Sequence, residues 1–239
     1  MHGKSAAALI LSIALCAGPL GLLQAAPSNG TRFPPKGKIE SGYEYNVMFE
    51  RPLRNSFGDL KTQDHFYTLT FGVFDWLAID GKAGFGDVTE KNGKLPTLEY
   101  NTGFAGGYGF RIRVFAYEKW GLRGIVGAQH ISVHPHDRSI DNDKYEAFLD
   151  DWQVSGLVAK DFSCPSLPFK STVYVGMKGS DCEIVYKLNK HDKKRVSSEE
   201  HVGLVVGAEI YLFGDKARLS AEGRFIDETA FSTSLSYMF

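Results

Sequence analysis

Apolar and polar residues alternate with a period of two along most of the chain after residue 40, which is the pattern of β-strands rather than of helices. The clearest example closes the sequence. Its odd positions, Phe231, Thr233, Leu235, Tyr237 and Phe239, are mostly apolar, and the positions between them are three serines and a methionine. The chain is therefore expected to be all-β.

Ten such segments follow one another, and several carry a charge at every second position. Arg218, Glu222 and Arg224, for example, alternate with small or apolar residues, so they cannot all face an ordinary two-sheet core. Ten is an even number, as bacterial outer-membrane barrels require. The expected strands cover about 41–53, 64–75, 77–88, 98–117, 120–133, 145–161, 169–186, 201–213, 216–226 and 229–239.

The connections between these segments fall into two alternating classes. Tight turns are expected at 75–76, 118–119, 162–168 and 214–215. Between them, on the other side, mostly longer polar loops are expected at 54–63, 89–97, 134–144 and 187–200. A fifth connection on the loop side, at 227–228, is tight. Short turns on one side and longer loops on the other are typical of membrane barrels. We predict a closed antiparallel transmembrane up-and-down β-barrel of about ten strands, with eight or twelve as alternatives. A soluble secreted sandwich or lipocalin-like barrel also alternates and is the competing interpretation.

Alternation also assigns the side chains to two faces. One face is apolar and is expected to meet lipid, with Trp76, Trp120, Phe162 and Phe213 forming an aromatic girdle at the short-turn end. The other face is expected to place a mixed, largely filled network of charges in the lumen: Glu44, Asp80, Lys82, Arg111, Arg113, Arg123, Asp151, Lys178, Glu209, Arg218, Glu222 and Arg224.

The first 26 residues have the form of a secretory signal peptide, with Lys4, an apolar stretch from Ala6 to Leu23 and small residues before Pro27. We expect cleavage after Ala25, leaving a short periplasmic segment over 26–40 and a barrel domain over 41–239. An uncleaved membrane anchor is the alternative. The chain carries 27 Lys plus Arg against 28 Asp plus Glu, so nothing in its charge would recruit nucleic acid.

The end of the chain resembles the C-terminal assembly signal of bacterial outer-membrane β-barrel proteins, in which alternating apolar residues lead to a final aromatic one. Leu235, Tyr237 and Phe239 carry the resemblance. It implies the Gram-negative cell envelope, outer-membrane lipid and lipopolysaccharide as surroundings, and the barrel-assembly machinery as a partner during biogenesis. In architecture the chain is similar to the small OmpA-type and opacity-type barrels. We expect a monomer without a cofactor.

Three kinds of function compete for such a barrel. The first is a structural, adhesin-like or surface-interaction role with a filled, charged lumen. The second is a narrow, porin-like pore for ions or small polar solutes. The third is an outer-membrane enzyme, because His130 and Ser132 lie two apart on one strand face and resemble the His-x-Ser element of the outer-membrane lipid A deacylases. That resemblance needs an acid to orient the histidine, for which Asp141, Asp143 or Glu146 are the candidates.

Two further patterns are weaker. His134, His136 and Asp137 offer metal-binding side chains, but at no spacing of a known site, so no metal is expected. The cations of the 187–200 loop could meet lipopolysaccharide phosphates, although a solvated loop explains them as well. Cys164, in a short turn, and Cys182, far along the next strand, are predicted to lie too far apart for a disulfide. An oxidised pair would require a turn at 176–183.

Overall fold

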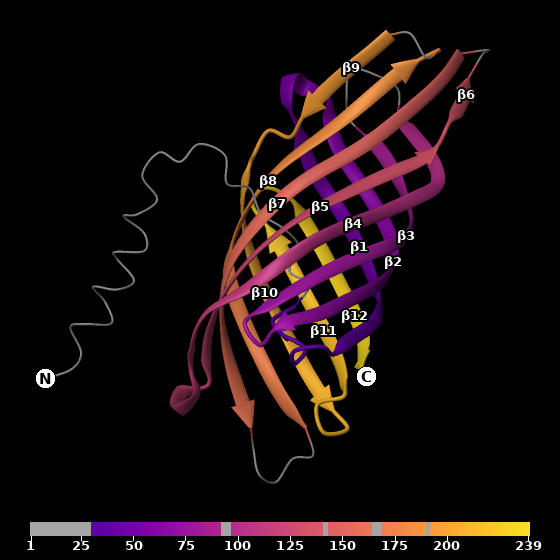
Figure 1. The fold of residues 1–239 in the computed structure, drawn as a ribbon. Coiled ribbons are helices and arrows are strands. Elements are labelled where there is room, and N and C mark those ends of the chain that lie inside the picture. The colour runs from indigo at the N-terminus through magenta and orange to yellow at the C-terminus, as the bar shows by residue number, and fades with distance from the viewer. Residues whose placement is uncertain (1–29, 92–96, 141–142, 164–168, 190–191) are drawn as a thin grey trace, which may run out of the picture.

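The computed structural model describes residues 30–91, 97–140, 143–163, 169–189 and 192–239. Ten long strands form a closed wall around one lumen (Figure 1). The wall strands are β1 (Ile39–Leu53), β2 (Gly58–Phe74), β3 (Leu77–Lys91), β4 (Leu98–Tyr117), β5 (Leu122–His136), β7 (Asp143–Ser163), β8 (Lys170–Leu188), β10 (Val202–Leu212), β11 (Ala217–Phe225) and β12 (Thr229–Met238). The described residues also form two short strands, β6 (Arg138–Ile140) and β9 (Asp192–Ser197), and two single 3-10 turns, η1 (Arg54–Ser56) and η2 (Glu118–Trp120).

The sheet closes because its first and last wall strands pair. β1 runs antiparallel to β12 from Glu40 opposite Met238, and every other wall strand pairs with its neighbours in chain order. The predicted closed, antiparallel, ten-stranded barrel is thus confirmed. Within the described ranges no helix is long and apolar enough to cross a membrane.

The observed strands begin and end within a few residues of the predicted ones, with one larger difference. β2 begins at Gly58 rather than near 64, because residues from Asp59 onward already pair with both β1 and β3. β8 runs without interruption through 176–183, so that segment is strand and not turn. Cys182 is buried and free, and Cys164 lies outside the described residues.

The wall is taller on one side than on the other. β7 has 21 residues, whereas β11 has only 9. Above the short strands, β9 pairs with β8, Ser198 bridges Leu53, and the amide of Glu199 donates to Pro52 O at 2.8 Å. At the loop end, β9 and the residues after it therefore link β8 to β1 and complete a second, smaller ring above the short strands.

Because of this second ring, the tight turn between β11 and β12 lies inside the barrel and not at its surface. The turn between β11 and β12 was predicted among the surface loops, but Asp227 and Glu228 are 0% and 2% exposed. They lie inside the barrel because the turn is short and the ring above covers it. The turn supplies the lumen with two carboxylates.

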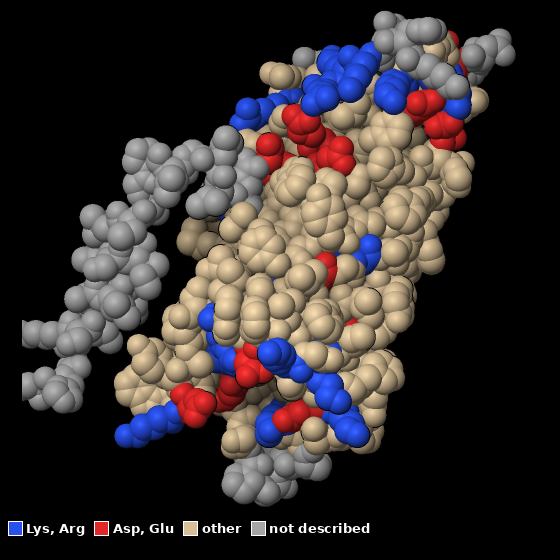
Figure 2. Space-filling model, in the orientation of Figure 1, with Lys and Arg blue, Asp and Glu red and all other residues tan. Residues whose placement is uncertain are grey.

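Outward-facing side chains form a broad apolar surface between two charged ends. Figure 2 shows most of the charged side chains gathered at the ends, with a wide band between them that carries few. Large apolar residues exposed on this band include Tyr67, Phe85, Phe104, Tyr108, Phe110, Trp152, Val158, Val175, Met177, Val206, Leu219 and Leu235. Trp76, Trp120, Phe162 and Phe213 are exposed at the short-turn end.

The close approach of β3 to β2 depends on a glycine. A Cβ atom at Gly84 would lie 1.8 Å from the carbonyl oxygen of His65, whereas a Cβ at Gly156 would meet nothing within 4 Å. We expect Gly84→Ala to destabilise the barrel by about 1–3 kcal/mol, as overpacking does, and Gly156→Ala to leave its stability nearly unchanged. The urea midpoint of refolded protein, read from heat-modifiable gel mobility, measures both. Equal midpoints for the two variants would contradict this packing.

Candidate functional site

The lumen holds nearly all the charges that the alternation assigned to it. Ten of the twelve predicted residues are at most 7% exposed: Glu44, Asp80, Lys82, Arg111, Asp151, Lys178, Glu209, Arg218, Glu222 and Arg224. Arg123 is partly buried, with its side chain 15% exposed. Arg113 instead lies at the short-turn rim, where it donates to the carbonyl of Asp75. Their placement makes the interior of the barrel polar at mid-height.

These buried charges are paired rather than aligned along a path. Arg111 donates through Nη2 and Nε to the two carboxylate oxygens of Asp80, at 2.7 and 2.8 Å. Lys82 Nζ lies 2.7 Å from Glu44 Oε1. Thr70 donates to Asp80 at 2.6 Å. A bidentate pair of this kind fixes both side chains and satisfies most of their hydrogen-bonding groups.

A larger group of paired charges surrounds the buried turn between β11 and β12, and we call it the central cluster. Glu228 accepts from Lys178 at 2.6 Å and from Arg224 at 2.7 Å, and Arg51 lies 3.3 Å from it. Arg51 also lies 3.0 Å from Asp151. These five side chains connect β1, β7, β8, β11 and the β11–β12 turn.

Sequence reasoning missed Arg51 and Glu228 for two different reasons. A shift of register between Met48 and Arg51 reverses the parity of β1, so Arg51 turns inward although strict alternation places it outside. Glu228 sits in a turn, and turns were expected at the surface. A charged residue in an otherwise short, tight turn was the one available signal.

The N-terminal segment enters the lumen from the short-turn end. Thr31 is completely buried and donates through its amide to Glu209 at 2.7 Å. Arg111 donates to the carbonyls of Gly30 and Arg32, at 2.8 and 3.0 Å, and Arg123 to that of Thr31 at 2.9 Å. Residues Gly30 to Phe33 of the segment expected to be periplasmic over 26–40 thus lie inside the lumen.

The loop-end half of the lumen is mostly apolar, although Asp64 and Glu90 are buried there as well, and the sequence did not predict this. Leu60, Phe66, Val88 and Ile184 are 0% exposed and form one cluster with neighbours from six further elements. We call this cluster the apolar cap; its other buried members are Met48, Leu53, Phe57, Leu98, Tyr100, Ala105, Ile131, Val133, Ala147, Leu149, Cys182, Tyr186, Val196 and Ala230. The apolar cap lies nearer the loop end than the central cluster. The lumen is therefore filled by apolar side chains at one level and by paired charges at the other.

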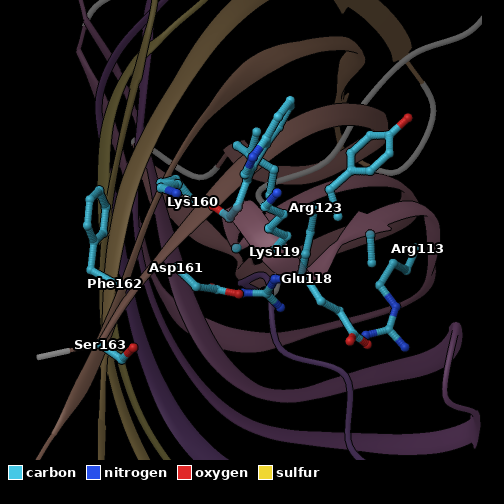
Figure 3. A pocket seen from close by; sticks show the side chains of 13 residues that line it. Arg113, Glu118, Lys119, Arg123, Lys160, Asp161, Phe162 and Ser163 are labelled. Carbon is cyan, nitrogen blue, oxygen red and sulfur yellow. Dashed lines mark hydrogen bonds and ion pairs between the residues drawn. The ribbon is translucent and has the colours of Figure 1, made fainter. Parts of the chain in front are cut away.

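The short-turn end is hollow by contrast. Two adjoining cavities of about 790 and 400 Å³ lie there and share Arg113, Arg123, Asp161, Phe162 and Ser163. We call them together the mouth cavity. Figure 3 shows Arg123 and Asp161 pointing toward one another across the larger cavity, and their charged groups are 2.6 Å apart.

The outer face carries a polar cluster at the loop-end edge of the apolar band. Ser132 Oγ lies 2.7 Å from His134 Nε2 and donates to Asp150 Oδ1 at 2.7 Å. His130 Nε2 lies 3.4 Å from the same Asp150 oxygen. We call these four residues the outer-face cluster. The sequence offered Asp141, Asp143 or Glu146 as the acid, but the carboxylate that lies beside Ser132 is that of Asp150, because β5 pairs with β7 and sets Ser132 opposite it.

An apolar groove of about 370 Å³ adjoins this cluster. It is lined by Leu77, Ile79, Tyr108, Phe110, Ala128, His130 and Trp152, with backbone from Gly109 and Gln129. His130 and Trp152 lie side by side, with ring centroids 4.5 Å apart. The outer-face cluster therefore has a hydroxyl, imidazoles and a carboxylate next to an apolar surface.

The other acids and the metal candidates are used elsewhere. Glu146 lies 3.5 Å from Lys144, Asp143 accepts from Asn189 at 2.8 Å, and Asp141 lies outside the described residues. Asp137 is bonded to Lys144 and raises the pKa of that amine. His136 and Asp137 join no group of three metal-binding side chains in the described part of the chain, and neither does His134.

The two remaining predicted features lie at opposite ends. Lys187, Lys193, Lys194 and Arg195 belong to the β8–β9 hairpin at the loop end, with Lys194 4.2 Å from the ring centroid of Phe57. Leu235, Tyr237 and Phe239 point outward at the short-turn end and are 58%, 41% and 67% exposed.

The chain matches no protein-family model and no curated protein. Among solved structures it is similar to the outer membrane protein AlkL in lipid bilayers, with 11% identity, a TM-score of 0.42, and 91% of this chain and 97% of that chain covered. It is also similar to the transport unit of the autotransporter AIDA-I from Escherichia coli, with 11% identity, a TM-score of 0.42 and 96% of each chain covered. An outer membrane channel from Pseudomonas putida F1 follows at 12% identity and a TM-score of 0.37, covering 90% of this chain and 99% of that chain.

Removing a cation from the central cluster should destabilise the barrel strongly. In Arg51→Met the carboxylates of Asp151, Asp227 and Glu228 lose a buried partner, which typically costs about 3–5 kcal/mol. Arg195→Met removes an exposed pair with Glu183 and should cost at most about 1 kcal/mol. Urea titration of both variants tests this; an Arg51→Met barrel as stable as the Arg195→Met barrel would refute it.

Proposed function

We propose that this protein is an integral outer-membrane β-barrel whose lumen is closed and whose interactions take place on its surface. The observation that carries the proposal is the packing of the lumen. Inward side chains from the central cluster and the apolar cap, Arg51, Lys178, Leu60 and Phe66 among them, are 0–1% exposed. A water-filled channel beside them would leave their surfaces accessible.

The outward face supports membrane insertion. Side chains such as Phe104, Tyr108 and Met177 are about 60% exposed, and a soluble barrel would leave this apolar surface in water. Both described ends of the chain lie at the short-turn end, which we assign to the periplasm. The loop end then faces the cell exterior, as in other small outer-membrane barrels.

Two partners follow from this placement. The cations of the β8–β9 hairpin stand at the level where lipopolysaccharide phosphates are found, and cations near an anionic leaflet gain electrostatic energy. Leu235, Tyr237 and Phe239 present the C-terminal signal for the barrel-assembly machinery. The structural, adhesin-like or surface-interaction role is therefore preferred to a pore.

A closed lumen predicts an electrically silent barrel. Refolded protein in a planar bilayer should show no discrete conductance, because paired charges and the apolar cap fill the lumen at two levels. Heat-modifiable mobility of the same sample serves as the control for folding. Steady single-channel steps from a folded sample would contradict the closed lumen and favour the narrow pore.

A second function is favoured by the outer-face cluster. We propose that Ser132 acts as the nucleophile of an ester hydrolase on outer-leaflet lipid, consistent with its resemblance to the lipid A deacylases. Its hydroxyl is within hydrogen-bond reach of the imidazole of His134, a candidate base. Asp150 accepts from Ser132 and lies 3.4 Å from His130, the histidine of the sequence pattern.

The proposed reaction has two steps. The Ser132 hydroxyl first turns its single proton from Asp150 to His134 Nε2. Oγ then attacks the ester carbonyl while that proton passes to His134, and the alcohol leaves with it. Water then attacks the acyl-serine, releasing the fatty acid and restoring the hydroxyl. Asp150 and the neighbouring His130 position the serine at the edge of the apolar groove, where an acyl ester of a bilayer lipid could reach it.

A serine-reactive alkyl fluorophosphonate tests this second function. We expect it to label the folded wild-type barrel. Ser132→Ala should abolish this labelling because the oxygen that would bond to phosphorus is gone, and His134→Gln should slow it by about 10²–10⁴-fold, as loss of a general base does. Ser41→Ala is the matched control, because Ser41 is another outward serine with a hydrogen-bonded hydroxyl. Labelling that survives in Ser132→Ala would remove the hydrolase and leave the closed barrel intact.

A further inference from the structure

The mouth cavity at the short-turn end has more positive than negative groups in its lining. Its cations are Arg32, Arg113, Lys119, Arg123, Lys160 and Lys170. Its acids are Glu118, Asp161 and Asp215. The chain as a whole is nearly neutral, with a net charge of −1, so this surplus is local.

Two of the guanidinium groups are held in place by neighbouring residues while one nitrogen of each has no hydrogen-bond partner in the described chain. Arg32 is anchored by Glu40, 3.1 Å from its Nε, and its side chain is only 8% exposed, yet its Nη1 is buried without a hydrogen-bond partner among the described residues. Arg123 is anchored by Thr31 O and Asp161, and its buried Nε likewise has no partner in the described chain. Both arginines line the 400 Å³ cavity.

We propose that the mouth cavity is a binding site for a phosphate group. Planar guanidinium groups match the oxygens of phosphate, and a group carrying up to two negative charges suits a surplus of three cations. Arg32 and Arg123 line the cavity and are held by Glu40 and Asp161, so a phosphate that enters meets cations that are already in place. The cavity also has apolar walls, from Phe33, Phe162 and Tyr211, for whatever carries the phosphate.

The anchors of the site explain why it is preorganised. Arg123 and Arg111 donate to the backbone of the inserted N-terminal segment, and Phe33 of that segment lies under Arg111 and Arg113, at 5.5 and 5.6 Å from the ring centroid. Arg113 and Arg123 are thus held in place before any ligand arrives. The phosphate could belong to an anionic lipid headgroup, because Trp120 and Phe162 mark the membrane edge, or to a soluble molecule.

Binding to the folded full-length chain tests the site. Calorimetric titration with inorganic phosphate, in a neutral detergent, and co-sedimentation with phosphatidylglycerol against phosphatidylcholine vesicles give the two arms. We expect saturable binding in at least one arm, weakened about tenfold or more by Arg123→Gln, because a charge-assisted hydrogen bond is lost. Arg32→Gln gives a second, independent variant if Arg123→Gln does not fold.

Arg195→Gln is the matched control, because it removes an exposed arginine at the opposite end of the barrel. Binding of inorganic phosphate would identify a soluble ligand, and preference for phosphatidylglycerol alone a lipid headgroup; either supports the site. Absence of saturable binding in both arms would overturn the proposal. So would an unchanged affinity in Arg123→Gln and Arg32→Gln, or an equal loss in Arg195→Gln, which would indicate attraction by overall charge.

Discussion

Closure of the hydrogen-bond ladder between β1 and β12 is the constraint on which the rest of this structure depends. Once the first and last strands pair, from Glu40 to Glu50 on β1, the sheet has an inside and an outside. Every second side chain must then enter a narrow lumen, whatever its charge. The apolar outer band and the polar interior are two consequences of one geometric fact.

A closed ring forces buried charges to find partners inside it, on neighbouring strands or across the lumen. Asp80 on β3 meets Arg111 on β4, while Glu228, carried inward by its turn, meets cations from β1, β8 and β11. Unpaired, each of these buried charges would be costly. The pairing therefore offsets the cost of burying the charges that alternation directs into the lumen.

The chemistry that remains for function lies outside this packed interior. At the loop-end edge of the outer band, Ser132, His134 and Asp150 combine hydrogen-bonding groups with an apolar groove. At the other end, the mouth cavity combines cations with aromatic walls. Both sites use wall strands as rigid supports, which suits functional groups that must be held in place. The barrel acts in this view as a scaffold with two separate surfaces.

The sequence by itself determined the class of fold, the number of wall strands and the face of most side chains, because a period of two is a local property of the chain. Ten of the twelve predicted lumen charges are buried for that reason. Tertiary structure alone decided what depends on pairing across the sheet or on local shifts of register. Arg51 points inward because of a register shift in β1. Asp227 and Glu228 are buried because β11 and β12 are short. Asp150 lies opposite Ser132 because of the register between β5 and β7. Alternation carries no information about the register between neighbouring strands, and that register is what assembles a site.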